Sequence, residues 1–284
     1  MWPVALFVLT SVLLVGAGTA NAEDTGSQEE LPDRFMIRGG AAYVFNADTT
    51  FGINGSSGLG ALVDFSQVLK GQRDDFSWRI DSYYRFNPRH SVGFSYYNVR
   101  RKGDARLDAD INVGDTTFAA GGQVLSTLDI GLYRFYYNYS FHHDEKVELA
   151  GSVGLYFADI GLNLSGNLTC TGSPSCTGLP QTPRAESSTL TVPLPSLGFL
   201  VKYNFTPRLQ AHARFDWFYV DTGNFQGDMN ELYLGLEYRL FKHFSIGAAF
   251  NRLDVNVKYL PDQGSGFNVS NNWNMLYGFG SLYF

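Results

Sequence analysis

The segment "NELYLGLEYRL" (residues 230–240) has two faces of opposite character when it is extended. One face consists of Leu232, Leu234, Leu236, Tyr238 and Leu240. The other face consists of Glu231, Tyr233, Gly235, Glu237 and Arg239. A period of two with one apolar face predicts a half-buried β-strand. In a soluble sandwich the charges would point to water, whereas in a membrane barrel they would line the interior and the leucines would face lipid.

The same alternation recurs in "FSWRIDSYYRF" (76–86) and "QAHARFDWFYV" (210–220), and the polar faces again carry full charges of both signs. A buried charge must be paired. If the fold is a barrel, we therefore predict a lumenal network of ion pairs. Its members are Arg38, Arg79, Asp81, Arg85, Glu148, Lys202, His212, Arg214, Asp216, Glu231, Glu237 and Arg239.

Three features favour the membrane barrel. Residues 1–22 combine an apolar run, Ala5 to Val15, with a small-residue cleavage site, Ala20-Asn21-Ala22, which is typical of a secretory signal peptide. Residues 23–33 would then form a periplasmic tether. The second feature is that Tyr, Trp and Phe gather near the strand ends, as in the aromatic girdles of membrane barrels. No run of roughly 18 apolar residues follows Ala22, so no transmembrane helix is expected.

The third feature is that short and long connections alternate, as do the periplasmic turns and extracellular loops of outer-membrane barrels. The short ones are 87–90, 142–146, 206–209 and 241–243, and the long ones are about 46–75, 102–126, 164–188, 221–229 and 259–272. We predict an all-β, antiparallel up-and-down barrel over residues 34–284. Its ten strands lie near 34–45, 76–86, 91–101, 127–141, 147–163, 189–205, 210–220, 229–240, 244–258 and 272–284.

Eight or twelve strands remain alternatives, because "GALVDFSQVL" within 46–75 also alternates. This stretch could be an extra hairpin above the membrane or part of a twelve-strand barrel. In 127–141 the apolar parity switches after Leu132, which predicts either a β-bulge near Gly131–Tyr133 or an upper part that has left the membrane. In 244–258 charged residues take over the lipid-facing parity from Arg252 onward, so we expect that half to stand in water or among lipopolysaccharide head groups.

The segment "NNWNMLYGFGSLYF" (271–284) is predicted to pair with the first strand, because an open sheet edge is not tolerated in lipid. Phe284 and Leu282, with Leu276 behind them, resemble the C-terminal assembly signal of bacterial outer-membrane β-barrels. The phrases "YYRFNPRHSVGFSYY" (83–97) and "LYRFYYNYSF" (132–141) are similar to those of the small OmpA-like and OmpW-like barrels. The resemblance implies a location in the outer membrane of a Gram-negative bacterium and handling by the barrel assembly machinery during biogenesis. It brings no catalytic motif.

The remaining candidates for chemistry are few. Cys170 and Cys176 can form a disulfide in an exported chain. One predicted strand leaves the outer leaflet at three basic residues, Arg100, Arg101 and Lys102. Lipopolysaccharide phosphates lie at this depth, so these residues either bind the phosphates or form an ordinary basic loop flank. A net charge of -6 gives no support to nucleic-acid binding. "LDADINVGD" (107–115) begins like a calcium loop but lacks its Gly and Glu, so we expect an acidic loop and no metal.

His243 and Ser245 superficially resemble the pair of lipid-hydrolysing barrel enzymes, but they sit at the periplasmic rim. We therefore expect no catalytic residue, no cofactor and no enzyme. Three functions stay open: a structural or surface-interaction protein acting through long extracellular loops, a narrow channel for small solutes, and a lipid-modifying enzyme. A lumen crossed by ion pairs favours the first. The expected partners are outer-membrane lipids and lipopolysaccharide, while the sequence does not identify a loop ligand.

Overall fold

The computed structural model describes residues 33–54, 61–64, 75–106, 111–113, 116–118, 123–167, 184–259 and 266–284, which lie in one compact unit, Pro32–Phe284. The predicted signal peptide (1–22), almost all of the tether (23–33), and the pair Cys170 and Cys176 lie outside the described residues. In the part of the chain that is described, no helix is long and apolar enough to span a membrane.

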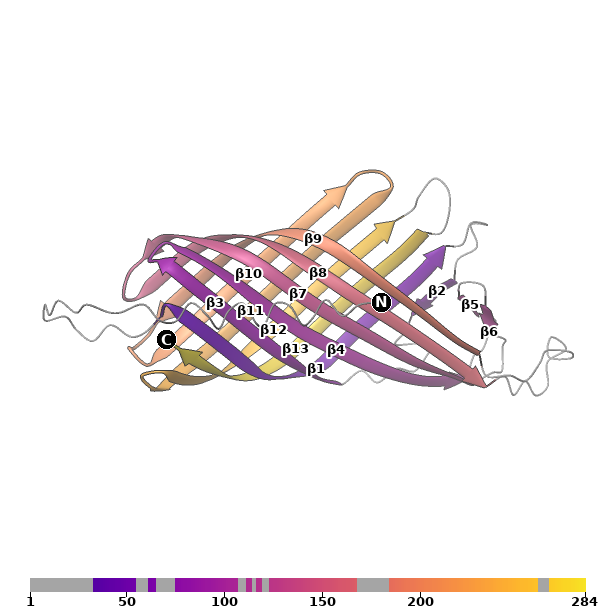
Figure 1. Cartoon of the computed structure of the whole chain (residues 1–284), viewed down its shortest axis with the longest axis horizontal. Helices are drawn as coiled ribbons and strands as arrows, with labels where there is room; N and C mark the ends of the chain where they lie inside the picture. Colours follow the sequence, from indigo (N-terminus) through magenta and orange to yellow (C-terminus); the bar gives the residue numbers. More distant parts are fainter. Residues whose placement is uncertain are drawn as a thin grey trace, which may run out of the picture. The chain divides into compact units, whose positions relative to one another are not determined.

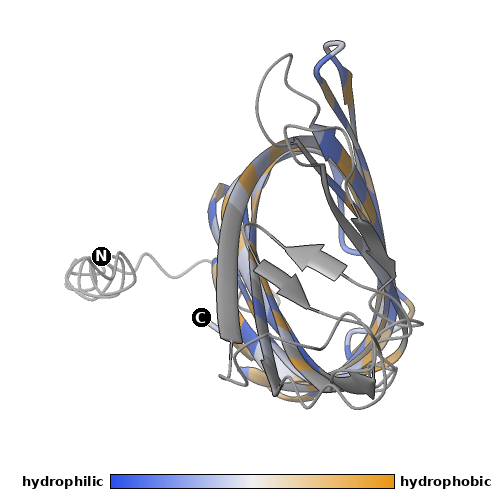
Figure 2. Cartoon of the chain, turned by 90° about the vertical axis from the view of Figure 1, so that its right-hand side faces the viewer, coloured by the Kyte–Doolittle hydropathy of each residue, from blue (hydrophilic) through white to orange (hydrophobic). Residues whose placement is uncertain are grey.

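Ten long strands form a closed antiparallel barrel, as the alternation predicted, and each pairs with its neighbours along the chain. They are β1 (Phe35–Asn54), β3 (Asp75–Asn87), β4 (His90–Arg106), β7 (Gln123–His143), β8 (Val147–Asn167), β9 (Arg184–Asn204), β10 (Leu209–Asp221), β11 (Phe225–Phe241), β12 (Phe244–Tyr259) and β13 (Gly266–Tyr283). Viewed along its axis, the barrel is a closed ring (Figure 2). The short turns and the C-terminus share one end, here called the turn end (left in Figure 1), and the opposite end is called the loop end.

The ring closes between its first and last strands, as expected for a sheet in lipid. β1 and β13 pair from Met36 with Tyr283 to Asn54 with Gly266, with one irregularity between Val44 and Asn46. At the turn end Phe284 N donates to Phe35 O (2.8 Å) and Phe35 N donates to Phe284 O (3.0 Å). The side chains of Leu282 and Phe284 lie exposed on the outer surface. Their role as an assembly signal stays a prediction.

At the loop end the structure agrees with one of the two alternatives for 46–75 and contradicts the predicted loop 221–229. β1 runs on to Asn54, and a short strand, β2 (Ala61–Asp64), pairs with residues 50–53 of β1, so this stretch contains the extra hairpin and not a strand of the ring. The predicted long loop 221–229 is wrong, because β10 and β11 meet in a tight turn. There Thr222 N donates to Phe225 O (2.9 Å), and Gly223 adopts a φ of 81°, which glycine tolerates without strain. β5 (Ile111–Val113) and β6 (Thr116–Phe118) form a separate pair.

The turns at the opposite end are held by local hydrogen bonds. In the β7–β8 turn the backbone N–H groups of Val147 and Lys146 donate to Asp144 Oδ1 at 2.7 and 2.8 Å. These bonds favour the charged carboxylate and lower the pKa of Asp144 below its ordinary value. In the β3–β4 turn Asn87 Oδ1 accepts from the backbone N–H groups of Arg89 and His90. Side chains of this kind replace the backbone partners that a strand loses where it ends.

The outer surface of the turn-end half is apolar. On β3 the exposed side chains are Trp78, Ile80, Tyr84 and Phe86, and on β11 they are Leu234, Leu236, Tyr238 and Leu240. A tilted strand needs about 9–11 residues to cross a bilayer, and the stretch of β3 from Trp78 to Phe86 has this length. Aromatic rings mark the border of this belt toward the loop end. There the ring centroid of Tyr96 lies 4.8 Å from that of Trp78 and 4.5 Å from that of Tyr133. Such a row is the aromatic girdle of a membrane barrel.

Toward the loop end the outer surface becomes polar. On β12, Phe250 is the last apolar residue of the outward parity, and Arg252 and Asp254 follow it, joined by an ion pair of 2.8 Å. On the other side of the barrel, Arg100 of β4 pairs with Asp129 of β7 at 2.5 Å. Polar side chains replace apolar ones at the same level on neighbouring strands, so the loop-end half of the barrel stands outside the hydrocarbon layer, as expected for 244–258.

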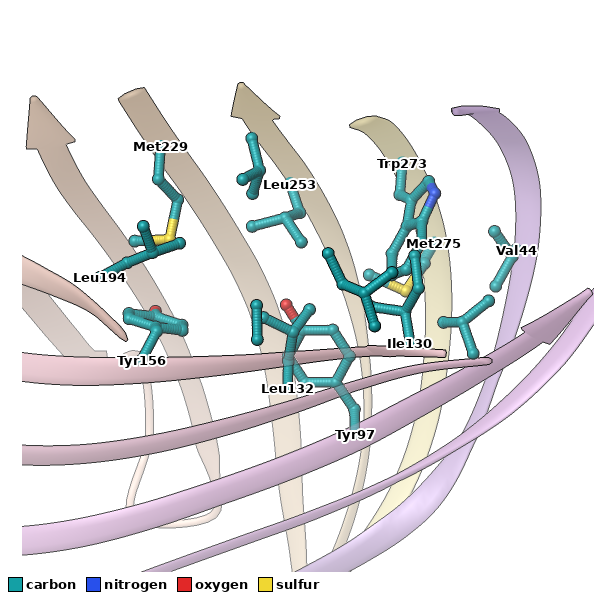
Figure 3. Close-up of a cluster of buried hydrophobic side chains, with 14 of the residues drawn as sticks. Val44, Tyr97, Ile130, Leu132, Tyr156, Leu194, Met229, Leu253, Trp273 and Met275 are labelled. Atoms are coloured by element: carbon teal, nitrogen blue, oxygen red, sulfur yellow. The ribbon is translucent and has the colours of Figure 1, made fainter. Parts of the chain in front are cut away.

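Where the outer surface changes from apolar to polar, the inner wall changes from polar to apolar. Its turn-end half is lined with charged and polar side chains, whereas its loop-end half is filled by an apolar core that nearly every strand of the ring supplies. Figure 3 shows this core, which includes Val44, Ile130, Leu132, Leu194, Met229, Leu253, Trp273 and Met275. Above the membrane the barrel therefore resembles a water-soluble protein, with polar residues outside and apolar residues inside.

This inversion explains the apparent change of register in β7. The pairings of β7 with β4 and β8 are both continuous from Gln123 to Tyr139, so the bulge predicted near Gly131–Tyr133 is absent. Leu128, Ile130 and Leu132 keep the inward parity of Arg134 and pack in the apolar core. The second alternative, an upper part that has left the membrane, is the one that agrees with the structure.

Candidate functional site

The most concentrated chemistry lies inside the turn-end half of the barrel, centred on two carboxylates that have no solvent exposure, Asp216 and Glu231. Asp216 accepts from Arg134 at 2.6 Å and lies 2.8 Å from Arg214 Nε. Arg214 also lies 3.1 Å from Glu231, and Glu231 contacts Arg79 at 3.3 Å. These side chains come from β3, β7, β10 and β11, so the ion pairs connect opposite walls of the lumen.

Neutral groups complete this central cluster. The Tyr156 hydroxyl lies 3.1 Å from Asp216 and 2.5 Å from Glu231, and Asn251 Nδ2 donates to Glu231 at 2.7 Å. The cluster also includes one further ion pair, between Arg79 and Asp81 of the same strand, at 3.0 Å. A carboxylate that is removed from water needs several partners, and this dense coordination offsets the cost of burying Asp216 and Glu231.

A second cluster lies nearer the turn end, around Glu237. Arg38 forms an ion pair with Glu237 and donates to Ser281 at 3.0 Å. The hydroxyls of Ser245 and Tyr283 donate to the same carboxylate, the latter at 2.6 Å.

His212 connects the two clusters. Its ring stacks on Tyr233 at 5.3 Å between centroids, and its Nε2 lies 3.4 Å from Arg38 Nη1. His212 is therefore held by both an aromatic ring and a hydrogen-bonding neighbour, and its Nδ1 has no hydrogen-bond partner within the described part of the chain.

The third cluster occupies the mouth of the barrel at the turn end. Glu148 accepts from Arg85 Nη2 at 2.9 and 3.0 Å, from Lys202 Nζ at 3.0 Å, and from the Ser140 hydroxyl at 2.6 Å. Lys202 also lies over the Tyr83 ring at 4.9 Å.

The predicted lumenal residues all face inward, but pairing is uneven. Arg239 forms no ion pair with a carboxylate among the described residues, and its guanidinium lies over the Tyr283 ring at 4.4 Å. Arg134 and Tyr156 were missed by sequence reasoning, although they are central. Arg134 lies in the segment where the apolar residues switch parity. It shares the parity of Leu132, so extending one unbroken strand register through this segment would have placed it inside the barrel.

Close approach of the backbone supports the central cluster. Gly198 lies directly across from Asp216, and a Cβ atom at Gly198 would lie 2.3 Å from Asp216 Oδ1. A side chain there would displace the carboxylate from its arginines. Glycine at this position therefore makes room for the ion pairs.

A small cavity opens among the clusters. It has a volume of about 70 Å³ and is lined by residues of all three clusters, including Arg38, Arg134, Glu148, Lys202 and His212. Many of its lining residues lie within two positions of a strand's turn-end limit, among them Met36, Arg85, Ser91, Glu148, Lys202, Gln210 and Tyr283. Above the cavity the apolar core begins.

The other candidates are placed as follows. His243 Nδ1 contacts the Tyr283 carbonyl at 2.8 Å, whereas the buried Ser245 donates to Glu237, so the two side chains engage different partners. Arg100 and Lys102 are exposed on the outer surface, but Arg101 is buried, so Arg100 and Lys102 are the two of the three that are placed to contact lipopolysaccharide. That contact stays a prediction. No group of His, Cys, Asp or Glu within the described ranges could hold a metal ion.

Neither a family model nor a curated protein sequence matches the chain. Among solved structures, the outer membrane protease OmpT from Escherichia coli is similar with a TM-score of 0.52 and 10% identity, over 90% of this chain and 99% of that one. OprG from Pseudomonas aeruginosa aligns with a TM-score of 0.36 and 13% identity, over 88% and 95% of the two chains. The likeness to OmpT shows that the chain has the fold of a Gram-negative outer-membrane β-barrel, and this fold agrees with the predicted location in the outer membrane.

Proposed function

We propose that this protein is a closed scaffold in the outer membrane, that its lumen conducts no solute, and that its loop end faces the exterior and acts there. The observation that carries the proposal is the double filling of the lumen. The turn-end half is crossed by ion pairs between opposite walls, and the loop-end half is filled by the apolar core. A solute would have to displace both.

The same observation weighs against a narrow channel. Interior width grows with the number of strands, and ten strands leave little more space than the eight whose interior side chains fill completely. Here the bulky Trp273, Met229 and Tyr156 occupy that space, and all three are fully buried. A path for ions would need polar side chains along its length, which the apolar core does not supply.

An enzymatic role has less support than a surface role. The fold is shared with the protease OmpT, but one fold hosts many functions, so this likeness does not transfer an activity. The side chains that could act as acids or bases, Asp216 and Glu231, are held by arginines in a lumen that substrate does not reach. The polar outer wall of the loop end, with exposed Arg100 and Lys102, is the surface offered to lipopolysaccharide phosphates and other extracellular partners.

The proposal requires that the loop end face outward, and cysteine labelling tests this orientation. In a chain carrying Cys170→Ser and Cys176→Ser, a cysteine replaces Asn224, which is exposed in the β10–β11 turn at the loop end. We expect a membrane-impermeant maleimide to label this variant on intact cells, because the turn stands above the outer leaflet. The labelled protein should fractionate with the outer membrane.

The matched control is Glu145→Cys in the same background, since Glu145 is equally exposed but lies in a turn at the opposite end. It should be labelled after the outer membrane is permeabilised and not before. Labelling of Glu145→Cys alone on intact cells would reverse the orientation and with it the proposed site of action. Recovery of the protein in the soluble periplasmic fraction would exclude the membrane scaffold altogether.

A further inference from the structure

The cavity inside the turn end has a strongly positive wall. Five cationic side chains line it, Arg38, Arg85, Arg134, Lys202 and Arg214, against two carboxylates, Asp81 and Glu148. The carboxylates that pair with these cations lie mostly behind them. Asp216, which binds Arg134 and Arg214, and Glu237, which binds Arg38, are not among the lining residues. Arg38, Arg134 and Arg214 thus line the cavity without these counter-charges, whereas Glu148, which pairs with Arg85 and Lys202, shares the wall with them.

Two of the lining residues, Arg134 and His212, carry buried side-chain nitrogens that lack a hydrogen-bond partner in the described ranges. Arg134 is 1% exposed and binds Asp216 through Nη2, while its Nε and Nη1 have no hydrogen-bond partner in the described ranges. His212 is 8% exposed, and its Nδ1 is likewise without a partner there. A buried donor without an acceptor is unfavourable, because it has lost its hydrogen bonds to water. The arrangement is thus incomplete as a purely structural network.

The guanidinium of Arg134 is fixed as a donor. It lies over the Tyr136 ring at 4.1 Å and within 5.5 Å of the Tyr156 ring, in addition to its ion pair with Asp216. These contacts hold its plane, so the unused N–H groups keep one direction. Fixed guanidinium N–H groups match the oxygen spacing of an oxyanion, which is why arginine recognises phosphate and carboxylate.

We propose that this cavity binds one small inorganic oxyanion of the phosphate or sulfate type, reached from the turn end, which is the periplasmic end in the proposed orientation. Arg134 and His212 supply the unused hydrogen-bonding nitrogens, and Arg38, Arg214 and Lys202 supply the surrounding positive charge. The volume of about 70 Å³ is several times the roughly 10–15 Å³ that a single buried water needs, so the cavity has room for a small anion. Because the apolar core closes the other side, the site is a dead end and binds without conducting.

Inorganic phosphate is the probe for the test. The full-length barrel, folded in detergent micelles, is titrated with sodium phosphate by calorimetry, and its unfolding midpoint is followed at constant ionic strength with sodium chloride as the replaced salt. We expect saturable binding, and a midpoint that rises with the logarithm of the phosphate concentration, as a ligand of the folded state requires. Arg134→Lys keeps a cation beside Asp216 but lacks the free guanidinium donors, so its affinity should fall about tenfold or more.

Arg89→Gln is the matched control, because Arg89 is an exposed arginine in a turn at the same end and lies outside the cavity. It should bind phosphate as the wild type does. If Arg134→Lys fails to fold, His212→Phe, which removes the second unpaired nitrogen, should weaken binding instead. The proposal is overturned if the wild type shows no saturable phosphate binding at millimolar concentrations. It is overturned equally if chloride gives the same midpoint rise, or if Arg89→Gln loses as much affinity as the cavity variants.

Discussion

Glu231→Gln is expected to lower the free energy of unfolding by about 3–5 kcal/mol, the usual cost of removing one member of a buried ion pair. Glu231 is fully buried and lies against both Arg79 and Arg214. Glutamine has nearly the same shape but no charge, so Arg79 and Arg214 each lose one of two carboxylate partners and the buried cluster gains a net positive charge. Chemical denaturation of the folded barrel in detergent, followed by tryptophan fluorescence, measures the loss.

Glu145→Gln provides the control, because Glu145 is an exposed carboxylate in the β7–β8 turn and should change stability by less than about 0.5 kcal/mol. The loss in Glu231→Gln should persist at high salt, since buried pairs are screened far less than exposed ones. Equal stability of the two variants would mean that water reaches Glu231 freely and that the central cluster does not seal the lumen.

Trp273→Ala tests the apolar half of the lumen and should cost about 3–5 kcal/mol, as large-to-small substitutions of buried aromatic residues do. Trp273 is fully buried in the apolar core, and its Nε1 donates to Thr49 Oγ1 at 3.3 Å. Removing the indole leaves a void that the barrel wall cannot close, because the strands are fixed by their ladders. The midpoint of chemical unfolding in detergent is again the measurement.

Trp78→Ala is the matched control for this substitution. Trp78 lies on the outer surface and is 48% exposed, so detergent or lipid can fill the space that the indole leaves. It should lose clearly less stability than Trp273→Ala. A Trp273→Ala variant as stable as Trp78→Ala, with a new conductance, would indicate that the loop-end lumen is a gated pore and not a packed core.

Most of the barrel could be predicted from the sequence, because the period-two alternation fixes which side chains share a face. The number of strands followed from the alternating short and long connections. The inward orientation of Arg79, Asp216 and Glu231 followed from parity once the signal peptide, the aromatic residues and these connections favoured a membrane barrel. The prediction failed where the environment changes along one strand. In β7 the outward face passes from lipid to water on the loop-end side of Tyr133. The apolar residues therefore move from the outward to the inward parity there, while the pairing register stays the same.

The partners within the network were beyond sequence reasoning. Which carboxylate meets which arginine depends on strand tilt and on contacts across the lumen, such as Arg134 of β7 with Asp216 of β10. The tight β10–β11 turn was also missed, because Gly223 gave a local signal for a turn but the flanking polar residues resembled a loop. Those residues are polar because the wall there stands in water.

Single-channel recording in planar bilayers tests the central claim, that the lumen is sealed by the ionic clusters below and the apolar core above. The wild-type barrel, inserted and verified as folded, should show no conductance steps in monovalent salt at either polarity. Reproducible steps of one defined size from the wild-type protein would contradict the account, because they would require an ion path past both Glu231 and Trp273.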